Sequence, residues 1–216
     1  MTLQAVGLAV GRGQAPLFSG LDLRVEPGQA VHVRGANGRG KTSLLRVLCG
    51  LSRPWSGEVR WCGKGVDHRH DAFRADVLYI GHQASLKDEL SALENVLFAQ
   101  ALAGQPISEE QGLKGLAEWG LLERAWQPAR SLSQGQRRRV GLARLTASPA
   151  PRLIVLDEPF NALDQASVEQ LSAQLDHLVS AGIALVYTSH LEGGWPSVQP
   201  QQLDLDHLSA SRQEWA

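Results

Sequence analysis

Short apolar runs recur along the chain, each bounded by turn residues and each about the length of one β-strand. They predict strands at 21–25, 31–34, 57–61, 77–80, 153–156 and 183–188, and the pattern allows one more short strand at 203–205. A helix is predicted at 42–48, where three leucines have helical spacing and Gly50 follows as a stop signal. A strand, a glycine-rich loop and a helix in this order are typical of an α/β domain.

The centre of the chain has a different pattern. Between residues 85 and 134 no run predicts a strand convincingly, while leucines recur at the three- and four-residue spacing of a helix. We therefore expect a single domain with a mixed sheet, in which a helical lobe at 84–135 is inserted into a core lobe formed by 1–83 and 136–216. Near the N-terminus three glycines argue against a helix, and the first strand predicted from the apolar runs is the one at 21–25.

The composition is typical of a globular domain with a real core. The chain has 216 residues, of which 43% are hydrophobic and 20% charged. Lys and Arg number 21 against 22 Asp and Glu, so the net charge of -1 argues against a general electrostatic attraction to nucleic acid or an anionic membrane. No apolar run approaches the roughly 18 residues of a membrane span. We expect any role at a membrane to depend on a partner.

The strongest chemical signal is the segment 35–42, which reads GANGRGKT and satisfies the pattern G-x-x-x-x-G-K-[ST] between a predicted strand and a predicted helix. Glycines let the backbone fold around a polyphosphate, and its N–H groups and the helix N-terminus supply a positive field. Lys41 is expected to neutralise phosphate oxygens, and Thr42 to bind Mg²⁺. The predicted nucleotide-binding residues of this loop are Gly35, Ala36, Asn37, Gly38, Arg39, Gly40, Lys41, Thr42 and Ser43.

A second signal lies at 153–158, where four apolar residues lead directly into Asp157 and Glu158. Such a strand delivers its two carboxylates to the carboxyl edge of a parallel sheet, where phosphates bound by the glycine loop would lie. Asp157 is expected to hold Mg²⁺ through water, and Glu158 to act as general base toward the attacking water. Two carboxylates at a strand end are often merely solvated, but the glycine loop favours catalysis.

The segment Leu132-Ser133-Gln134-Gly135-Gln136 precedes this acidic strand, and with it the chain resembles the ATP-binding subunits of ABC transporters. Gln134 departs from the commonest form of this signature, which has glycine there. The resemblance implies ATP and Mg²⁺ as cofactors. It also implies a homodimer in the ATP-bound state, which holds each ATP between the glycine loop of one copy and Ser133, Gly135 and Gln136 of the other.

The same resemblance assigns roles to three more positions. It implies that Gln83 is a catalytic residue and metal ligand that couples Mg²⁺ contact to lobe movement. Asp164 lies in a loop expected at the nucleotide, and His190 is expected to donate to the γ-phosphate. The family commonly stacks adenine on an aromatic residue of the first hairpin, but the equivalent segment here has none, so Arg12 is expected to stack on the base.

Within the family, the stretches around Gly81-His82-Gln83 and Leu93-Glu94-Asn95 look like the ATPase subunits of the haem exporter of cytochrome c maturation. This implies an ATP hydrolase, peripheral on the cytoplasmic face of the inner (plasma) membrane, that energises an integral membrane transporter subunit and binds no nucleic acid. Two alternatives stay open. One is an ATPase subunit for another cargo such as a lipid or drug, and the other is a non-transport ABC ATPase acting on ribosomes or DNA.

Two surface segments have competing interpretations. The partner-facing surface is expected at 84–90, where Leu86 and Leu90 either contact the membrane partner or belong to the core of the helical lobe. The run at 137–139 contains three consecutive arginines, which would point in three directions from a helix. We expect Arg138 or Arg139 to pair with carboxylates while the others stay hydrated, rather than a nucleic-acid site.

Overall fold

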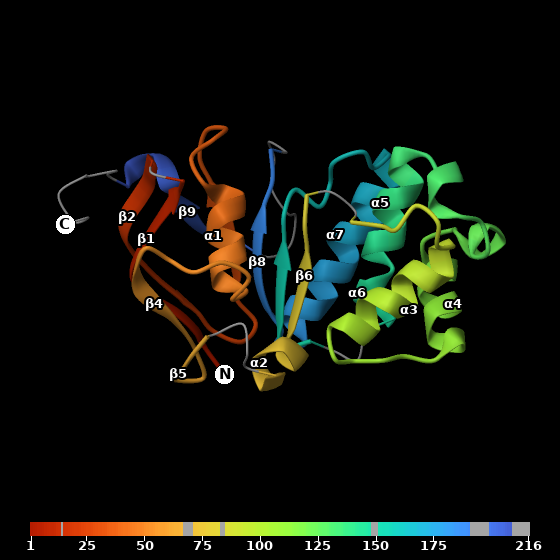
Figure 1. Cartoon of the computed structure of the whole chain (residues 1–216), viewed down its shortest axis with the longest axis horizontal. Coiled ribbons are helices and arrows are strands. Elements are labelled where there is room, and N and C mark those ends of the chain that lie inside the picture. The colour runs from red at the N-terminus through yellow and green to blue at the C-terminus, as the bar shows by residue number, and fades with distance from the viewer. Residues whose placement is uncertain (14, 67–70, 83–84, 148–150, 191–198, 209–216) are drawn as a thin grey trace.

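The computed structural model describes residues 1–13, 15–66, 71–82, 85–147, 151–190 and 199–208. It contains a parallel sheet, an antiparallel sheet, and helices that pack on both faces of the parallel sheet. In Figure 1 the antiparallel sheet lies at one end of the molecule and the helices of residues 92–147 lie at the other, with the parallel sheet between them. The predicted α/β class is confirmed.

The parallel sheet has the strand order β6-β7-β8-β3-β9, and every neighbouring pair in it is parallel. All four residues of β7 and all five of β8 are buried, as expected for strands covered on both faces. The carboxyl ends of these strands therefore meet at one edge. The strands are β3 (Ala30–Arg34), β6 (Val77–Ile80), β7 (Leu153–Leu156), β8 (Ala184–Thr188) and β9 (Gln201–Asp204).

The antiparallel sheet has the order β2-β1-β4-β5 and includes a strand that the hydrophobic pattern did not predict. This strand, β1, pairs with both β2 and β4, but its register shifts at several points, one of them around Gly7, which has φ 55°. Such bulges interrupt the alternation of buried and exposed residues on which strand prediction depends. The strands are β1 (Leu3–Arg12), β2 (Ala15–Val25), β4 (Ser56–Trp61) and β5 (Lys64–Gly65).

The two faces of the parallel sheet belong to two hydrophobic clusters. On one face, Leu153 and Val155 pack with α1 (Lys41–Leu48) and the antiparallel sheet. On the other, Ile154 and Leu156 pack with α7 (Gln165–Ser180) and the helices of residues 92–147. Because the alternate residues of one strand serve both clusters, β7 is fixed in place at the centre of the molecule.

Helices occupy the segment where a helical lobe was predicted. Serines at the N-caps of α3, α4 and α5 each form a capping box with the residue three positions later, which satisfies the first N–H groups of these helices. The division into lobes at 84–135 stays a prediction. The helices here are α3 (Ala92–Leu102), α4 (Glu109–Glu118), η1 (Leu122–Arg124), η2 (Ala129–Ser131), α5 (Gln134–Leu142) and α6 (Arg144–Ala147), and α2 (Asp71–Asp76) precedes β6.

Within the described part of the chain, no helix combines the length and the apolar character that crossing a membrane requires. The longest helix, α7, has 16 residues and buries one face against the sheet.

Candidate nucleotide-binding site

The glycine loop connects the end of β3 to the start of α1, at the carboxyl edge of the parallel sheet. Gly38 and Gly40 have φ angles of 84° and 100°, a region that residues with a Cβ rarely adopt. Gly40 is the N-cap of α1 and offers no side chain to the first turn, so the N–H groups there are available to an anion. Lys41 Nζ donates to Gly35 O at 2.7 Å, which places the ammonium group across the loop.

The acidic end of β7 lies against this loop. Thr42 Oγ1 donates to Asp157 Oδ2 at 2.7 Å, and Thr188 Oγ1 donates to Asp157 Oδ1 at 2.8 Å. Asp157 is only 1% exposed, so α1 and β8 hold both of its carboxylate oxygens in a fixed direction. The two sequence motifs, which lie more than a hundred residues apart, thus meet through a direct hydrogen bond.

Glu158 has an unusual backbone and a carboxylate oxygen without a hydrogen bond. Its φ is 50°, and Glu158 N donates to Thr188 Oγ1 at 2.8 Å. Within the described residues, Glu158 Oε1 is buried and lacks a hydrogen-bond partner, while His190 Nε2 lies 3.3 Å away without hydrogen-bond geometry. A buried acceptor of this kind needs a donor, and an attacking water molecule would supply one.

These groups line one cavity of about 470 Å³. It brings together most of the glycine loop, both carboxylates, His190 and Arg12. Arg12 is the residue that was expected to stack on the base. His82 and Asn161 also line it, and the sequence pattern did not assign either of them to nucleotide binding individually. The complete set is Arg12, Leu17, Asn37, Gly38, Gly40, Lys41, Thr42, Ser43, His82, Asp157, Glu158, Asn161 and His190.

Several predicted site residues do not line this cavity. Gln83, predicted as a metal ligand, lies outside the described residues. Asp164 is the N-cap of α7, where its side chain accepts from Ser167 N at 2.8 Å, and this bonding lowers the pKa of its carboxyl. Gly35, Ala36 and Arg39 belong to the loop, but the Arg39 side chain contacts residues 205–208 instead. Their roles at the nucleotide stay predictions.

The signature residues also lie away from the cavity of their own chain. Ser133 is exposed and caps α5, with Ser133 Oγ accepting from Gln136 N at 3.2 Å and Gln136 Oε1 accepting from Ser133 N at 2.9 Å. A Cβ on Gly135 would lie 2.8 Å from Ala162 O, so α5 packs tightly against the loop that follows β7. The signature is therefore well formed, but it is not part of the cavity within one chain.

The expectation that Arg138 or Arg139 pairs with a carboxylate while the other arginines stay hydrated is wrong: among the described residues Arg137 forms the ion pair, with Asp88, and Arg138 is buried. Its side chain is only 4% exposed and donates to the carbonyl oxygens of Asp157, Glu158 and Pro159, with distances of 2.7 to 3.1 Å. It also donates to Gly81 O at 2.8 Å and His82 O at 3.3 Å. Burial lowers its pKa to about 10, opposed by Asp157 and Glu158. Arg138 thus connects α5 to the acidic strand end and to the residues just before Gln83.

Comparisons with known proteins agree with this geometry. The chain matches the family model described as ABC transporter over residues 18–161. It is 45% identical to the cytochrome c biogenesis ATP-binding export protein CcmA of Aromatoleum aromaticum, over 96% of this chain and 97% of that protein. It is 47% identical to the protein of the same name from Methylococcus capsulatus, over 87% of this chain and 91% of that one.

Solved structures give the same fold. A dimeric bacterial ABC transporter cassette superposes with a TM-score of 0.84 at 23% identity, over 96% of each chain. The dimeric post-hydrolysis state of an ATP-binding cassette bound to ADP and Pi has a TM-score of 0.79 at 25% identity, over 88% of each chain. The residues matched by the family model, 18–161, include the glycine loop and the acidic strand end. The chain therefore belongs to the ABC transporter family and, within it, to the cytochrome c biogenesis ATP-binding export proteins CcmA.

Proposed function

We propose that this chain hydrolyses ATP to energise an integral membrane transporter subunit of the CcmB type in haem export for c-type cytochrome biogenesis. The observation that carries the proposal is the hydrogen bond between Thr42 and Asp157, which brings the glycine loop and the acidic strand end into one cavity. The curated relatives, named for ATP binding and export in cytochrome c biogenesis, support the biological assignment.

The loop and the start of α1 bind the phosphates of ATP in this proposal. The N–H groups of the first turn of α1 and the ammonium group of Lys41 supply the positive charge that a triphosphate requires. Lys41 leaves Gly35 O and moves to the β- and γ-phosphate oxygens. Arg12, at the cavity wall, stacks on the base.

The donor set at the loop fits Mg²⁺, because the Thr42 hydroxyl and the Asp157 carboxylate are hard oxygen donors that lie within 2.7 Å of each other. Gln83 is the third predicted ligand. Bound Mg²⁺ would neutralise phosphate charge. Thr188 keeps Asp157 oriented by bonding its second oxygen.

Glu158 performs the proton transfer. Glu158 Oε1, which has no hydrogen-bond partner among the described residues, accepts a proton from the water that attacks the γ-phosphorus. The bond from this phosphorus to the β–γ bridging oxygen breaks, and ADP leaves. His190, 3.3 Å from Glu158 Oε1, donates to the γ-phosphate as the reaction proceeds. Because the signature lies outside this cavity, we propose that a second copy of the chain supplies Ser133, Gly135 and Gln136 and that the ATP-bound state is a homodimer.

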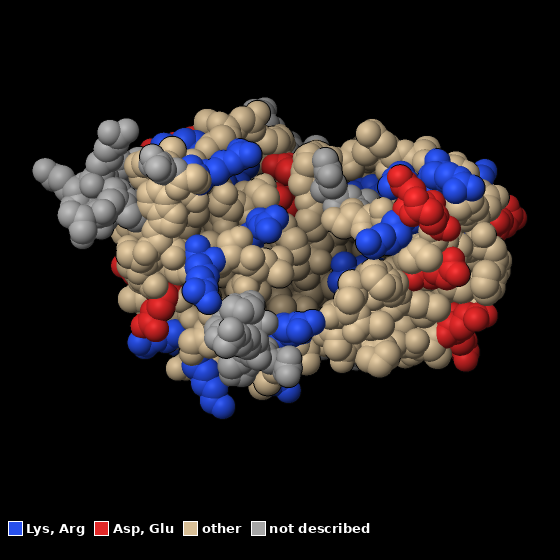
Figure 2. Space-filling model, in the orientation of Figure 1, with Lys and Arg blue, Asp and Glu red and all other residues tan. Residues whose placement is uncertain are grey.

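The membrane subunit binds a groove of about 450 Å³ between β6 and α3. Figure 2 shows a hollow on this face between the two halves of the molecule. Around the groove, Leu51, Phe98 and Leu102 are 54%, 42% and 59% exposed. Leu86, predicted as a contact residue, lines the groove and also packs on the core, whereas Leu90 is not among the lining residues. The chain is then peripheral, on the cytoplasmic face of the inner (plasma) membrane.

Arg144 defines the chemistry of the segment that this groove accepts. Arg144 Nε is buried without a hydrogen-bond partner, and within the described residues Arg144 makes no ion pair; only Nη1 donates, to Tyr79 O at 3.3 Å. Burial lowers the pKa of this guanidinium to about 10. An apolar cytoplasmic segment of the membrane subunit that carries a carboxylate would supply the missing partner.

Copurification tests the assignment. Tagged chain isolated from solubilised membranes should carry an integral membrane subunit, identified by mass spectrometry, and no ribosomal RNA. Leu102→Glu should abolish this copurification while ATP binding stays normal. Leu122→Glu is the matched control, because Leu122 is 52% exposed on the same group of helices but away from the groove. Equal copurification of the two variants would contradict the groove. In cells, normal holo-cytochrome c content with Glu158→Gln as the only copy would contradict the role in cytochrome c biogenesis.

A further inference from the structure

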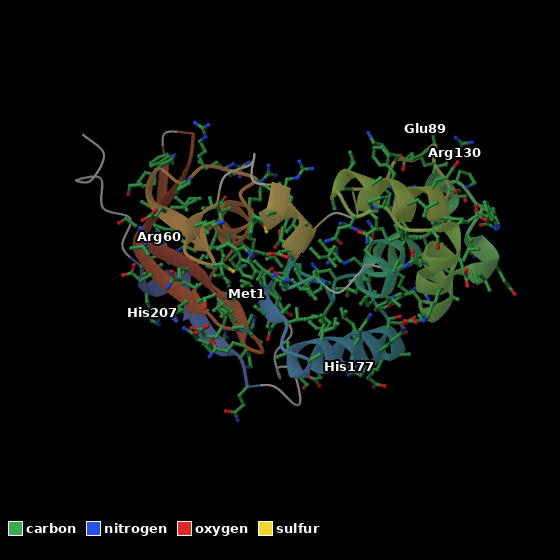
Figure 3. The ribbon with its side chains drawn as sticks, turned by 90° about the horizontal axis from the view of Figure 1, so that it is seen from below. Met1, Arg60, Glu89, Arg130, His177 and His207 are labelled. Atoms are coloured by element: carbon green, nitrogen blue, oxygen red, sulfur yellow. The ribbon has the colours of Figure 1, made fainter. Side chains whose placement is uncertain are left out.

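The nucleotide loop is held on its outer side by the segment 204–208, which contains the 3₁₀ turn η3 (Leu205–His207). This segment follows β9, which pairs in parallel with β3 so that Arg34 lies opposite Asp204. It therefore leaves the sheet at the edge where the loop begins. Leu205 is fully buried in the core and anchors the turn. In Figure 3 the turn, marked by His207, lies at the opposite end of the molecule from Glu89 and Arg130.

Arg39 makes most of the contacts. Its Nη2 donates to Leu205 O at 2.9 Å and to Leu208 O at 3.1 Å, and its Nε forms an ion pair with Asp206 Oδ1 at 2.9 Å, without hydrogen-bond geometry. The other carboxylate oxygen of Asp206 accepts from Ala36 N at 2.9 Å. One aspartate thus binds the loop at two positions. Because a guanidinium group holds its donors in a fixed planar fork, Arg39 restricts the position of the segment 204–208 more than a lysine would.

The contacts matter because the loop is costly to order. Gly35, Gly38 and Gly40 all have positive φ, at 141°, 84° and 100°, and glycine loses more conformational freedom on ordering than any other residue. Phosphate binding needs the inner N–H groups of the loop to point in fixed directions. Contacts on the outer side that fix Ala36 and Arg39 therefore reduce the ordering that ATP itself must bring about.

We propose that Arg39 and Asp206 form a clamp through which the segment 204–208 positions the nucleotide loop, so that ATP binding and the ordering of this segment stabilise each other. The inference rests on the proposed function, because it takes the loop to be the ATP site. Arg39 acts as a positioning residue. Its guanidinium is not among the groups that line the nucleotide cavity, although it belongs to the glycine motif.

Simple electrostatics makes the opposite prediction for one variant. Asp206 is a negative charge next to an anion-binding loop, so its removal should strengthen ATP binding if charge alone mattered. Removal of the clamp should weaken binding instead. The sign of the change in Asp206→Ala, and of Asp206→Asn as a variant of the same shape, therefore separates the two explanations.

The first experiment is a titration of purified chain with ATP, followed by calorimetry. Arg39→Ala and Asp206→Ala should each weaken binding about tenfold, and the double variant should be no weaker than about the worse single variant, because both remove one clamp. The turnover at saturating ATP should change less than the affinity. Arg34→Ala is the matched control, since it also removes one exposed positive charge beside the loop but has no side-chain contact with 204–208 among those described.

The second experiment measures hydrogen exchange in residues 201–208. Because coupling between sites is reciprocal, ATP should slow exchange there in the unaltered chain and in Arg34→Ala, and should have little effect in Arg39→Ala. Unchanged affinity in both clamp variants, or tighter binding in Asp206→Ala, would overturn the clamp alone. Failure of the unaltered chain to bind ATP would overturn the proposed function and the clamp with it.

Discussion

Glu158 shows how neighbouring groups hold a residue of this site in a backbone conformation that residues with a side chain rarely adopt. A left-handed backbone at a residue with a side chain costs roughly 1 to 3 kcal/mol and persists only where the surroundings determine it. Here Thr188 binds Glu158 N, and Arg138 Nη2 donates to Glu158 O at 2.7 Å. With its φ of 50°, the residue directs a buried carboxylate toward the cavity.

This arrangement predicts the effect of Glu158→Gln. The amide keeps the shape of the side chain but cannot accept the proton of the attacking water, so ATP should still bind while turnover falls at least about a hundredfold. An assay of phosphate release together with an ATP titration checks both parts. Glu169→Gln, on the exposed face of α7, is the control and should hydrolyse ATP normally. Unchanged turnover in Glu158→Gln would remove this residue from its assigned role.

Lys41 is predicted to act on binding rather than on the chemical step. Lys41→Ala removes the charge that balances the β- and γ-phosphates, so ATP affinity should fall at least about tenfold, or roughly 1.4 kcal/mol. Calorimetric titration measures the change, and Lys64→Ala, which removes an exposed charge at β5, should bind like the unaltered chain. An affinity within twofold of the unaltered value would show that Lys41 does not contact these phosphates.

At the scale of elements, Arg138 links α5 to the end of β7. Its five carbonyl partners come from the segments before Gln83 and after β7, so the helix that begins with the signature is bound directly to the backbone of the catalytic strand end. Movement of α5 would therefore displace the backbone of Asp157 and Glu158. This contact is a physical route by which the signature and the acidic strand end affect each other.

Arg138→Met should destabilise the chain by about 3 kcal/mol, because it leaves several buried carbonyl groups without a donor. Arg139→Met is the matched control, since in the part of the chain that the structure describes Arg139 makes a single long hydrogen bond, to Trp119 O at 3.3 Å, and is less buried. Arg139→Met should lower the free energy of unfolding by less than about 1 kcal/mol. Urea unfolding followed by circular dichroism measures both values. Equal stability of the two variants would contradict the central position of Arg138.

The different burial of Arg138 and Arg139 is a feature that the sequence could not predict. The glycine loop and the Asp157-Glu158 pair were predicted correctly as neighbours, because their chemistry requires fixed residue types next to recognisable strands. Arg138 and Arg139 are identical in local pattern, and only the packing of α5 on β7 buries one of them. Spacing to buried neighbours does not separate the two arginines, because Arg139 also has buried residues three and four positions later, Leu142 and Ala143.

At the scale of the whole molecule, one chain holds half of the predicted ATP site. The cavity contains the glycine loop and the carboxylates, while exposed Ser133 lies elsewhere on the surface. Gly135 is a poor position to test this, because any side chain there would press on Ala162 O in the same chain. Ser133 is better suited, because aspartate is as good an N-cap as serine and would preserve α5.

Ser133→Asp should therefore leave folding and ATP binding by one chain unchanged and prevent dimerisation, because a carboxylate would face the γ-phosphate bound by the second copy. In a Glu158→Gln background, which retains ATP, light scattering should show an ATP-dependent dimer that Ser133→Asp abolishes. Ser108→Asp is the matched control, since Ser108 caps α4 with the same pair of distances, 3.2 and 2.9 Å, to Gln111. If Ser133→Asp dimerises with ATP as readily as Ser108→Asp, then the signature does not contact the nucleotide of a second chain and each ATP site must be completed in another way.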